Sequence, residues 1–469
     1  MSAVPADFAV PTGCAVPEVS AASAGFAAPA VSAAARRVPG PDDPAARLLA
    51  GWYATGRPAG LTDHLRRHGP PPVATVAGGR TTPPLVEAVE AAGLTGRGGA
   101  GFPTARKLRA VAAGRRRPVL VVNAMESEPG SRKDRFLLAV APHLVLDGAV
   151  LAAAAVGADT IHVCLPRTRP VQQRELEAAV EERRRARPDP VRIRLHALPH
   201  GYVSSESTSL VRWLNGGPAL PTGNPPRSHE RGVARRPTLV QNAETLAHLA
   251  LVARYGPEWF RRTGTPEEPG TTLLTVSGAV TAPGVLEAAL GTPIATVLDR
   301  AGGPAEPLRA VLLGGFGGTW LRAEHLRTPL ARRELAPLGA APGAGVLIAL
   351  PRPACGLRET ARVLGYLAAQ SARQCGPCRY GLPAVAEDFA ALADGRADEE
   401  LLSRLRHRTG LLSGRGACGH PDGAARLAAS ALLAFADDVD RHLTQGTCPA
   451  AYEPPRIPVP PATPPETWR

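Results

Sequence analysis

The sequence predicts a three-part protein: an α/β part with a parallel sheet, a small α+β part, and a C-terminal helical bundle. Short apolar, β-branched runs alternate with helical patterns up to about Gly264, as is typical of a parallel sheet. Beyond that point Gly and Pro residues separate short strand-like runs, and the last third of the chain is helical in pattern. A chain of 469 residues is also longer than one hydrophobic core usually supports.

The α/β part begins with a helical pattern near residue 45, followed by helices expected at 85–92 and 104–113. Its strands are expected at 118–123, 160–165 and 191–198, with a long helical stretch after each of the first two.

The second part has strand-like runs at 272–276, 284–290 and 311–315, with a turn at Gly278, and ends near Pro351. Helices expected at 358–370, 384–392, 399–405 and 423–443 form the bundle. The expected boundaries are a disordered Ala/Pro-rich arm at 1–44, the α/β domain at 45–268, the small domain at 269–351, the helical domain at 352–448, and a disordered Pro-rich tail at 449–469.

Charge and cysteine content narrow the functional class. The net charge is +13, but the arginines are scattered without interleaved stacking aromatics, so we expect no nucleic-acid partner. An odd count of seven Cys without a secretory signal indicates a reducing, cytoplasmic compartment. The most apolar stretch, 144–156, is too short to cross a bilayer and contains Asp147, so any membrane association would be peripheral, within a larger complex.

A glycine run at 96–103, Gly-Arg-Gly-Gly-Ala-Gly-Phe-Pro, is the first candidate binding motif. It satisfies G-x-G-x-x-G but follows a helical pattern rather than a strand, so the usual dinucleotide-binding context is missing. Glycines let backbone amides approach a phosphate or a flat ring, and the next helix adds the positive end of its dipole. A tight turn between two helices is the alternative.

A polar stretch at 123–135 directly follows the predicted strand 118–123, where α/β sheets bind ligands. The chain contains two lysines, Lys107 just after the glycine run and Lys133 in this polar loop. A lysine is a compact charge that suits phosphate, so this placement favours a binding site over a merely solvated loop.

Cysteines mark a second candidate site. Cys375 and Cys378 form a CxxC pair in helical surroundings, with Cys418 further along the chain. No histidine has the spacing of a zinc finger, and a thioredoxin-like context is absent. We therefore prefer an iron-sulfur cluster to a structural zinc site.

Together these stretches resemble the NADH- and FMN-binding flavoprotein subunit of bacterial respiratory complex I, the NADH-quinone oxidoreductase F subunit, and its relatives in soluble hydrogenases and formate dehydrogenases. The resemblance extends from about residue 61 to 443. The run at 96–103 with Lys107 is similar to the family's glycine loop, and 123–130 to its Asn-Ala-Asp-Glu-x-Glu-Pro-Gly loop. The stretches 201–208 and 240–245 are similar to its Ala-Tyr-Ile-Cys-Gly-Glu-Glu-Thr and Val-Asn-Asn-Val-Glu-Thr.

The resemblance implies a Rossmann-like FMN- and NADH-binding domain, a ubiquitin-like β-grasp domain that binds soluble ligands, and a helical bundle with an iron-sulfur site. It implies an NAD(P)H dehydrogenase component that passes electrons through FMN to a [4Fe-4S] cluster and on to an iron-sulfur or ferredoxin-type acceptor protein.

The resemblance also assigns roles to residues. Those that would hold FMN or its phosphate are Gly98, Gly99, Lys107, Asn123, Asn242 and Thr245, and Gly96, Arg97 and Glu126 complete the cofactor-binding set. Phe102 would stack on the adenine of the nucleotide. The catalytic set, which would position the nucleotide, is Glu128, Tyr202 and Glu206. Three of the four cluster ligands would be Cys375, Cys378 and Cys418.

Three positions depart from the family pattern. Met125 replaces an Asp, which removes a polar contact near the flavin. Ser207 replaces the second Glu, a carboxylate that would repel a 2′-phosphate, so relaxed or NADPH-leaning specificity is expected. Ala372 replaces the first cluster cysteine. A fourth ligand from Ser371, Cys355, Cys448 or outside the chain, a three-iron form and an absent cluster all stay open, with Cys355 disfavoured by its distance along a helix.

Two alternatives follow from the same residues. A degenerate relative could act as a docking or assembly protein without hydride transfer, which the three departures favour and the retained glycine run and Glu128 oppose. A component of an ion-pumping ferredoxin:NAD oxidoreductase is less favoured, because the ferredoxin-type CxxCxxCxxxC run is missing.

Overall fold

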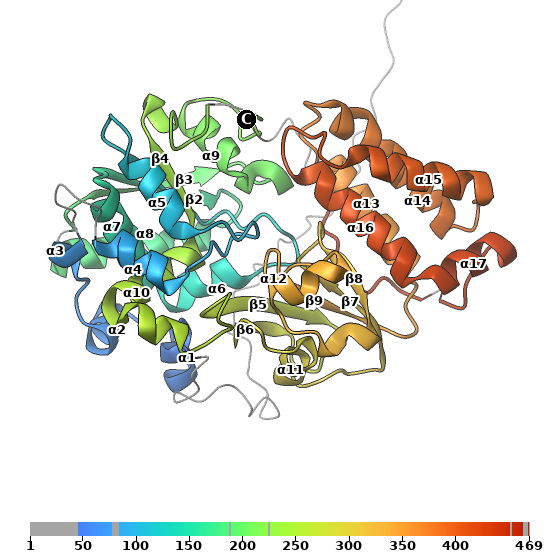
Figure 1. Ribbon diagram of the computed structural model, residues 1–469, viewed down its shortest axis with the longest axis horizontal. Helices are drawn as coiled ribbons and strands as arrows, with labels where there is room; N and C mark the ends of the chain where they lie inside the picture. The colour runs from blue at the N-terminus through green and yellow to red at the C-terminus, as the bar shows by residue number, and fades with distance from the viewer. Residues whose placement is uncertain are drawn as a thin grey trace, which may run out of the picture.

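The computed structural model describes residues 46–76, 84–186, 189–223, 226–450, 453–462 and 468. Figure 1 shows three groups of elements: α/β elements on the left, a second sheet below the centre, and a helical bundle on the right. The predicted three-part class is therefore confirmed. The expected arm at 1–44 lies outside the described residues.

The α/β part is built on four parallel strands in the order β3-β2-β1-β4. They are β1 (Val119–Asn123), β2 (Thr160–Pro166), β3 (Arg192–Leu198) and β4 (Thr238–Asn242). Strand β4 was not predicted, because its five residues are a weak signal outside a sheet. The helices of this part are α1 (Ala50–Thr55), α2 (Leu61–His68), α3 (Val73–Val76), α4 (Pro84–Ala92), α5 (Thr104–Ala112), α6 (Lys133–Val140), α7 (Pro142–Val156), α8 (Pro170–Ala186), α9 (Ser207–Leu214) and α10 (Ala243–Arg261).

Strand β1 is buried on both faces, which explains its continuous apolar run. Leu120 and Val122 face the main core, which includes side chains of α4, α5, α7 and α10. Val119 and Val121 face a smaller core that includes Leu210 of α9. The two layers hold the sheet rigidly, and its carboxyl edge is the base of the site described below.

The second part is a mixed five-stranded sheet in the order β6-β5-β9-β7-β8. Its strands are β5 (Thr271–Gly278), β6 (Gly284–Ala289), β7 (Leu308–Leu313), β8 (Thr319–Arg322) and β9 (Val346–Pro351), with helices α11 (Ile294–Arg300) and α12 (Arg332–Leu335). β5 and β9 pair in parallel and the other neighbours are antiparallel, as in a β-grasp sheet. The strand expected at 311–315 instead ends at Leu313, because Gly314 and Gly315 have φ of +100° and +101° and turn the chain.

The helical part contains α13 (Gly356–Ala369), α14 (Leu382–Ala393), α15 (Glu399–Leu412), α16 (His420–Ala434) and α17 (Ala436–Gln445). One helix was expected at 423–443, but the chain breaks at Phe435 (φ −119°, ψ 33°). The Phe435 ring is buried and packs edge-to-face on Trp320 with ring centroids 5.1 Å apart. A tertiary contact with the second sheet therefore accompanies a break that helical periodicity did not predict.

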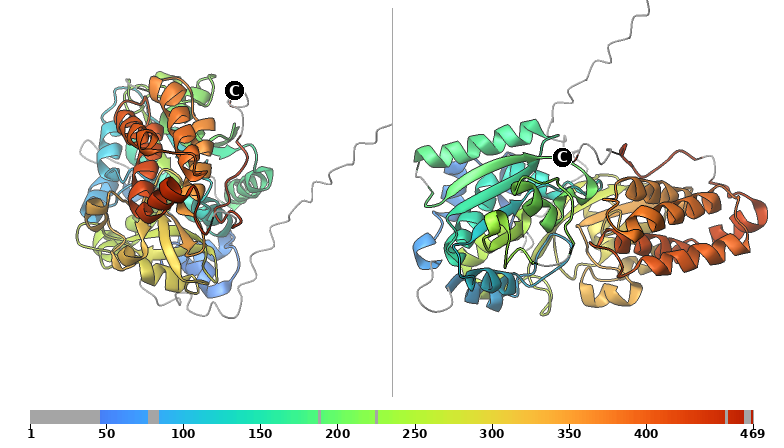
Figure 2. Two further views of the ribbon diagram at one scale, coloured as in Figure 1. Left: turned by 90° about the vertical axis from the view of Figure 1, so that its right-hand side faces the viewer. Right: turned by 90° about the horizontal axis from the view of Figure 1, so that it is seen from above.

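Part of the Pro-rich tail packs on the protein, unlike the disorder expected there. Ile457 is buried, and its backbone N–H donates to Glu359 Oε2 at 3.1 Å. Figure 2 shows the described tail leading from the bundle back toward the α/β part. Trp468 is also buried, against Gly201, where a Cβ atom would lie 2.3 Å from the indole.

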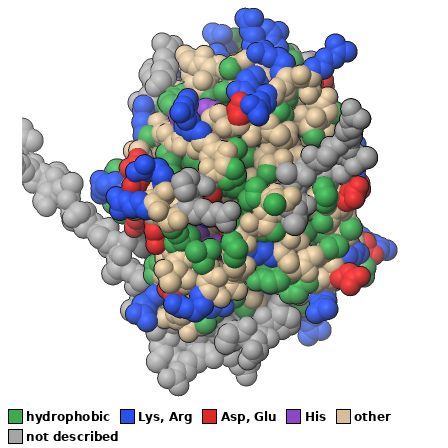
Figure 3. All heavy atoms as spheres, turned by 90° about the vertical axis from the view of Figure 1, so that its left-hand side faces the viewer, with side chains coloured by type: hydrophobic (Ala, Val, Ile, Leu, Met, Phe, Trp, Pro, Cys, Tyr) green, Lys and Arg blue, Asp and Glu red, His purple; other side chains and the backbone are tan. Residues whose placement is uncertain are grey.

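Among the described residues, no single helix is long and apolar enough to span a membrane. Taken together, α6 and α7 have the required length and composition, but they are bent by 98° relative to each other. Figure 3 shows Lys and Arg side chains in separate groups on the face of the α/β part, rather than in one patch.

Candidate functional site

The site lies where the strand order changes direction. The chain runs outward from β1 to β2 and β3 and then returns to place β4 on the other side of β1. Open α/β sheets bind ligands at this switch point, outside the carboxyl ends of the strands. Asn123 ends β1 and Asn242 ends β4, and the two residues are register partners. The structure thus brings two predicted cofactor residues together.

Each asparagine also orders a neighbouring segment. Asn123 Nδ2 donates to the Ser205 carbonyl at 2.8 Å, which ties β1 to the turn that carries Tyr202. Asn242 Oδ1 caps α10 by accepting from the backbone N–H of Glu244 at 3.0 Å.

The glycine run forms the loop between α4 and α5 and reaches the end of β4. The Arg97 backbone N–H donates to Thr245 Oγ1 at 2.8 Å, so Thr245 anchors the loop. A Cβ on Gly98 would lie 3.4 Å from Asn242 Cβ, and Gly99 has φ of +102°, so glycine permits this close approach. Gly96 closes the loop through a backbone bond to the Phe102 carbonyl at 2.9 Å.

The Arg97 side chain is directed away from this edge. Its buried guanidinium donates to the carbonyls of Thr271, Thr95 and Pro269. These bonds attach the glycine loop to the start of the second sheet. Any contact between Arg97 and a cofactor would therefore come from its backbone.

The two lysines have different environments. Lys107 Nζ donates to the Val240 carbonyl at 2.9 Å, beside the end of β4, and burial lowers its pKa. Lys133 is buried and ion-paired with Asp134 at 2.8 Å and Glu244 at 2.7 Å. Its charge is thus neutralised by carboxylates, which does not fit the suggested affinity of Lys133 for phosphate. Of the two, Lys107 keeps the placement that the sequence analysis favoured.

Glu126 organises the polar loop. It has the uncommon φ of +40°, and its carboxylate accepts from the backbone N–H groups of Asp134 at 2.8 Å and Arg135 at 3.1 Å. These donors belong to the first turn of α6, so Glu126 stabilises that helix terminus.

Glu128 and Tyr202 form the contact at the centre of the site. Tyr202 Oη donates to Glu128 Oε2 at 2.9 Å, and the Phe316 backbone N–H donates to Oε1 at 3.0 Å. Burial raises the pKa of Glu128 to about 7, although hydrogen bonds from Phe316, Tyr202 and Gly130 lower it. This carboxylate therefore titrates near neutral pH.

Sequence reasoning missed the loop of the second sheet that completes this contact. A run of Gly-Gly-Phe-Gly-Gly at 314–318 follows β7, and a Cβ on Gly315 would lie 2.6 Å from the Glu128 carboxyl carbon. The glycine-rich composition was the available signal. Its partner, however, lies in another part of the chain, so composition alone could not identify the contact.

An aromatic cluster, also missed, extends from Tyr202 toward the cysteines. The Tyr202 ring lies 5.1 Å from the His420 ring and 6.2 Å from the Tyr366 ring, between centroids. His420 stands two residues after Cys418 and is buried, which lowers its pKa to about 4 and keeps the imidazole neutral. The carboxylate site and the cysteine site are thus joined by packed side chains.

The remaining predicted residues lie around this centre. Phe102 is 47% exposed, with the Arg106 guanidinium 5.6 Å from its ring centroid, so part of the ring stays accessible to a planar group. Glu206 caps α9 by accepting from Thr208 N at 2.8 Å, and Ser207 Oγ donates to its Oε1 at 3.0 Å. Met125 is fully buried among apolar side chains, which accounts for an apolar residue at that position.

Cys375, Cys378 and Cys418 lie near one another at the end of the bundle that carries His420. Burial raises the pKa of Cys378, and the neighbouring Cys375 and Cys418 raise it further. Cys378 lies in a π-helical turn, Pro377–Gly381, a feature often found at functional sites. Ser371 is buried and its Oγ donates to the Cys378 carbonyl at 3.3 Å, so this hydroxyl lies next to the group.

Cys355 and Cys448 do not join this group. Cys355 caps the start of α13, whereas the loop to Cys375 follows the end of that helix. A helix of 14 residues is about 21 Å long, so the thiols of Cys355 and Cys375 lie at opposite ends of α13. Cys448 lies beside Cys355. Neither is therefore placed to supply the fourth ligand of the predicted cluster.

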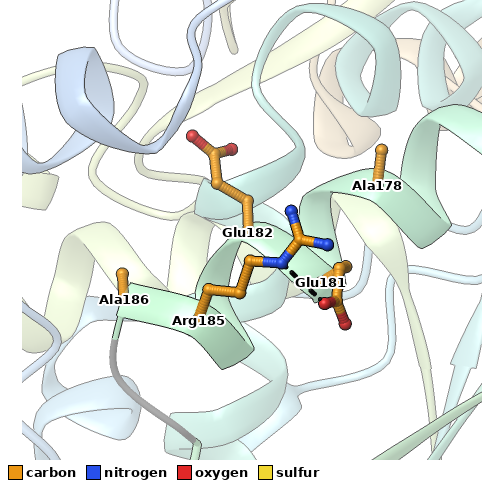
Figure 4. Close-up of a pocket in the computed structure, with 5 residues that line it drawn as sticks. All are labelled: Ala178, Glu181, Glu182, Arg185 and Ala186. Atoms are coloured by element: carbon orange, nitrogen blue, oxygen red, sulfur yellow. Dashed lines mark ion pairs between the residues drawn. The ribbon is translucent and has the colours of Figure 1, made fainter.

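A hollow on α8 lies apart from these residues. Figure 4 shows its lining by Ala178, Glu181, Glu182, Arg185 and Ala186, with Arg185 paired to Glu181 at 2.8 Å. It contains no residue of the candidate site.

Family models match each part of the chain. Residues 89–251 match the Nuo51 FMN-binding domain, 273–319 the SLBB domain, and 358–442 the NADH-ubiquinone oxidoreductase-F iron-sulfur binding region. The NADH-quinone oxidoreductase F subunit of Streptomyces coelicolor is 32% identical over 377 residues, which is 78% of this chain and 84% of that protein. The chain belongs to the family of NADH-quinone oxidoreductase F subunits.

Other relatives agree with this family assignment. The NADH-quinone oxidoreductase F subunit of Mycobacterium tuberculosis strain H37Rv is 32% identical, over 79% of this chain and 87% of that protein. In the crystal structure of air-oxidized NAD+-reducing [NiFe]-hydrogenase, a chain with 32% identity matches with a TM-score of 0.73. The match covers 84% of this chain and 69% of that chain. The predicted family and three-part fold are both confirmed.

The raised pKa of Glu128 gives a pH-dependent stability that Glu128→Gln should remove. Because folding raises this pKa from 4.5 to about 7, the stability it contributes is full below about pH 4.5 and is lost as pH rises through 7. The free energy of unfolding of the wild type should therefore fall by roughly 1 to 3 kcal/mol relative to that of the variant as pH rises over this range. Urea unfolding of both apoproteins from pH 4.5 to 8 measures the difference, and a pH-independent difference would contradict the assignment.

Proposed function

We propose that this chain oxidises NAD(P)H with FMN as its cofactor and passes the electrons through an iron-sulfur cluster to a partner protein. The observation that carries the proposal is one continuous arrangement. The glycine loop and the asparagines meet at the switch point, Glu128 and Tyr202 lie at the centre, and His420 joins Tyr202 to the cysteine group.

The chemistry of the switch point fits FMN. The glycine loop presents backbone beside Asn123 and Asn242 with little side-chain bulk, which suits the close approach of a flat ring or a phosphate. We propose that Gly96, Gly98 and Gly99 hold FMN together with Lys107, both asparagines and Thr245, and that Arg97 and Glu126 act by shaping the two loops. When bound, FMN would accept a hydride from the nicotinamide and release electrons one at a time.

We propose that Glu128, Tyr202 and Glu206 position the nucleotide, with Phe102 stacking on its adenine. Glu128 is held at two oxygens by Tyr202 and Phe316, so its orientation is set before a nucleotide arrives. Glu206 presents its carboxylate at the start of α9.

Three cysteines fit an iron-sulfur cluster incompletely, because Ala372 stands where the family has its first ligand. The nearby group that best fits the role of fourth ligand is the buried Ser371 hydroxyl beside Cys378. We propose that Cys375, Cys378, Cys418 and Ser371 hold the cluster.

The acceptor is proposed to be an iron-sulfur or ferredoxin-type protein, since the cluster delivers single electrons. We place the reaction in the cytoplasm, where thiols stay reduced. The docking or assembly role without hydride transfer has no support from the family matches, which include both cofactor-binding regions.

An anaerobic visible spectrum tests the function. The purified wild type should show flavin bands that bleach on addition of NADH or NADPH. Glu128→Gln should keep the flavin bands, because the glycine loop is intact, but should bleach at least about tenfold more slowly at limiting nucleotide. A colourless protein, or flavin that neither nucleotide bleaches, would support the docking role.

Nucleotide preference is tested at Ser207. A carboxylate introduced by Ser207→Glu should repel a 2′-phosphate and lower kcat/KM for NADPH relative to NADH by about tenfold. Ser207→Gln has a similar size without the charge and should leave the ratio near that of the wild type. If the ratio of kcat/KM for NADPH to that for NADH were the same in both variants, or if the wild type strongly preferred NADH, relaxed specificity would be contradicted.

Cluster content is tested by restoring the family ligand. Ala372→Cys supplies a thiolate, so iron and sulfide should reach about four per chain and survive gel filtration better than in the wild type. Ser371→Ala should lower the iron content of the wild type but not that of the Ala372→Cys background. Iron content insensitive to both changes would exclude Ser371 as the ligand.

A further inference from the structure

A second group of potential metal ligands lies at the other end of α13 from Cys375, Cys378 and Cys418. Cys355, His442 and Cys448 are all buried, and one ligand atom from each lies within 4.8 Å of the other two. Cys355 caps α13, His442 lies in α17, and Cys448 follows α17. Figure 1 shows α17 at the outer end of the bundle, away from the α/β part. No part of the proposed electron-transfer function uses this group.

The spacing of these atoms matches a single tetrahedral ion. Zinc binds thiolate sulfur at about 2.3 Å and imidazole nitrogen at about 2.0 Å, so tetrahedral geometry separates the two ligand atoms by about 3.5 Å. The observed distance from Cys355 Sγ to His442 Nε2 is 3.7 Å.

The His442 ring is oriented as a metal ligand requires. Its Nδ1 lies 3.1 Å from the Leu392 carbonyl oxygen, which only accepts, so Nδ1 carries the proton. In the neutral ring, Nε2 then presents its lone pair toward Cys355. Metal-bound histidines usually have such a carbonyl or carboxylate behind the other nitrogen, because it fixes the tautomer and the ring orientation.

Burial and the neighbouring Cys448 raise the pKa of the Cys355 thiol, so a metal ion would displace its proton on binding. The Arg358 backbone N–H points at its Sγ at 3.5 Å, at the N-terminus of a 14-residue helix whose dipole favours negative charge. Asp438 lies one turn before His442 on α17 and pairs with Arg309 at 2.6 Å, so its charge is already neutralised. This carboxylate is therefore already paired with an arginine, although its charge still raises the pKa of Cys355.

A small cavity borders one member of the group, Cys355. It has a volume of about 60 Å3 and is lined by Cys355, Arg358, Glu359 and residues of the tail, including Glu453. In the part of the chain that the structure describes, no fourth Cys, His, Asp or Glu joins the three ligands within that distance. A tetrahedral ion held by these three side chains would take water as its fourth ligand.

We propose that Cys355, His442 and Cys448 bind one zinc ion, separate from the iron-sulfur site. A site of two thiolates and an imidazole binds zinc in preference to harder divalent cations such as Mg²⁺ and Ca²⁺. The ion would bridge residues 87 positions apart, fastening the end of α17 and the start of the tail to the start of α13. Its role is to stabilise the outer end of the bundle.

Metal analysis of the full-length protein tests this site. Protein purified anaerobically from zinc-supplemented cells should contain about one zinc per chain by mass spectrometry. Cys448→Ser and His442→Gln should lower zinc at least about tenfold while iron and flavin stay at wild-type levels. Cys164→Ala, a buried cysteine in β2, is the matched control and should keep its zinc.

A second measurement covers variants that fold poorly. Wild-type protein stripped with a chelator should melt at a lower temperature, and added Co2+ should produce thiolate-to-cobalt absorption that Cys448→Ser lacks. Wild type without zinc and without these bands would overturn the proposal, leaving a hydrogen-bonded thiol and imidazole. Zinc lost on Cys375→Ser rather than Cys448→Ser would also overturn it, by placing the ion in the iron-sulfur site. Iron and flavin content report separately on the electron-transfer function.

Discussion

The site depends on the carboxylate of Glu128, which is held at once by two parts of the protein. Tyr202 belongs to the α/β part, Phe316 to the second sheet, and both donate to this carboxylate. Its desolvation is unfavourable and raises its pKa to about 7, so the hydrogen bonds must offset the burial of charge at neutral pH. A side chain at position 315 would clash with the Glu128 carboxyl group, so this junction requires glycine. A shift between the two parts would break the contact.

The helical part is joined to the same junction by polar bonds. The Tyr202 backbone N–H donates to Gln370 Oε1 at 3.0 Å, at the end of α13, and Arg212 of α9 donates to Gln374 Oε1 at 3.0 Å. These bonds position the loop that carries Cys375 relative to the nucleotide side of the site. Together with the His420 and Tyr366 rings, they connect the two proposed redox centres through packed, ordered side chains.

The departures from the family pattern are confined to side chains, and the scaffold around them is retained. Met125 fills an apolar core, and Ser207 hydrogen-bonds the acidic cap of α9. Ala372 precedes Arg373, whose φ is +52°, in the short loop after α13. A relative with an intact fold and altered contact groups is consistent with family membership at 32% identity, and differs from a degenerate scaffold that has lost its binding loops.

The sequence by itself determined the family, the three-part fold, and most strands and helices, and it pointed to the two loops and three cysteines of the candidate site, because periodicity and local motifs specify these features. It did not reveal β4, which is recognisable only when paired with β1, or the break at Phe435, where the ring packs on Trp320. Nor did it show that the Gly-Gly-Phe-Gly-Gly loop meets Glu128, or that Cys355 joins Cys448 and His442. Those contacts join residues far apart in the chain, so only tertiary packing decided them.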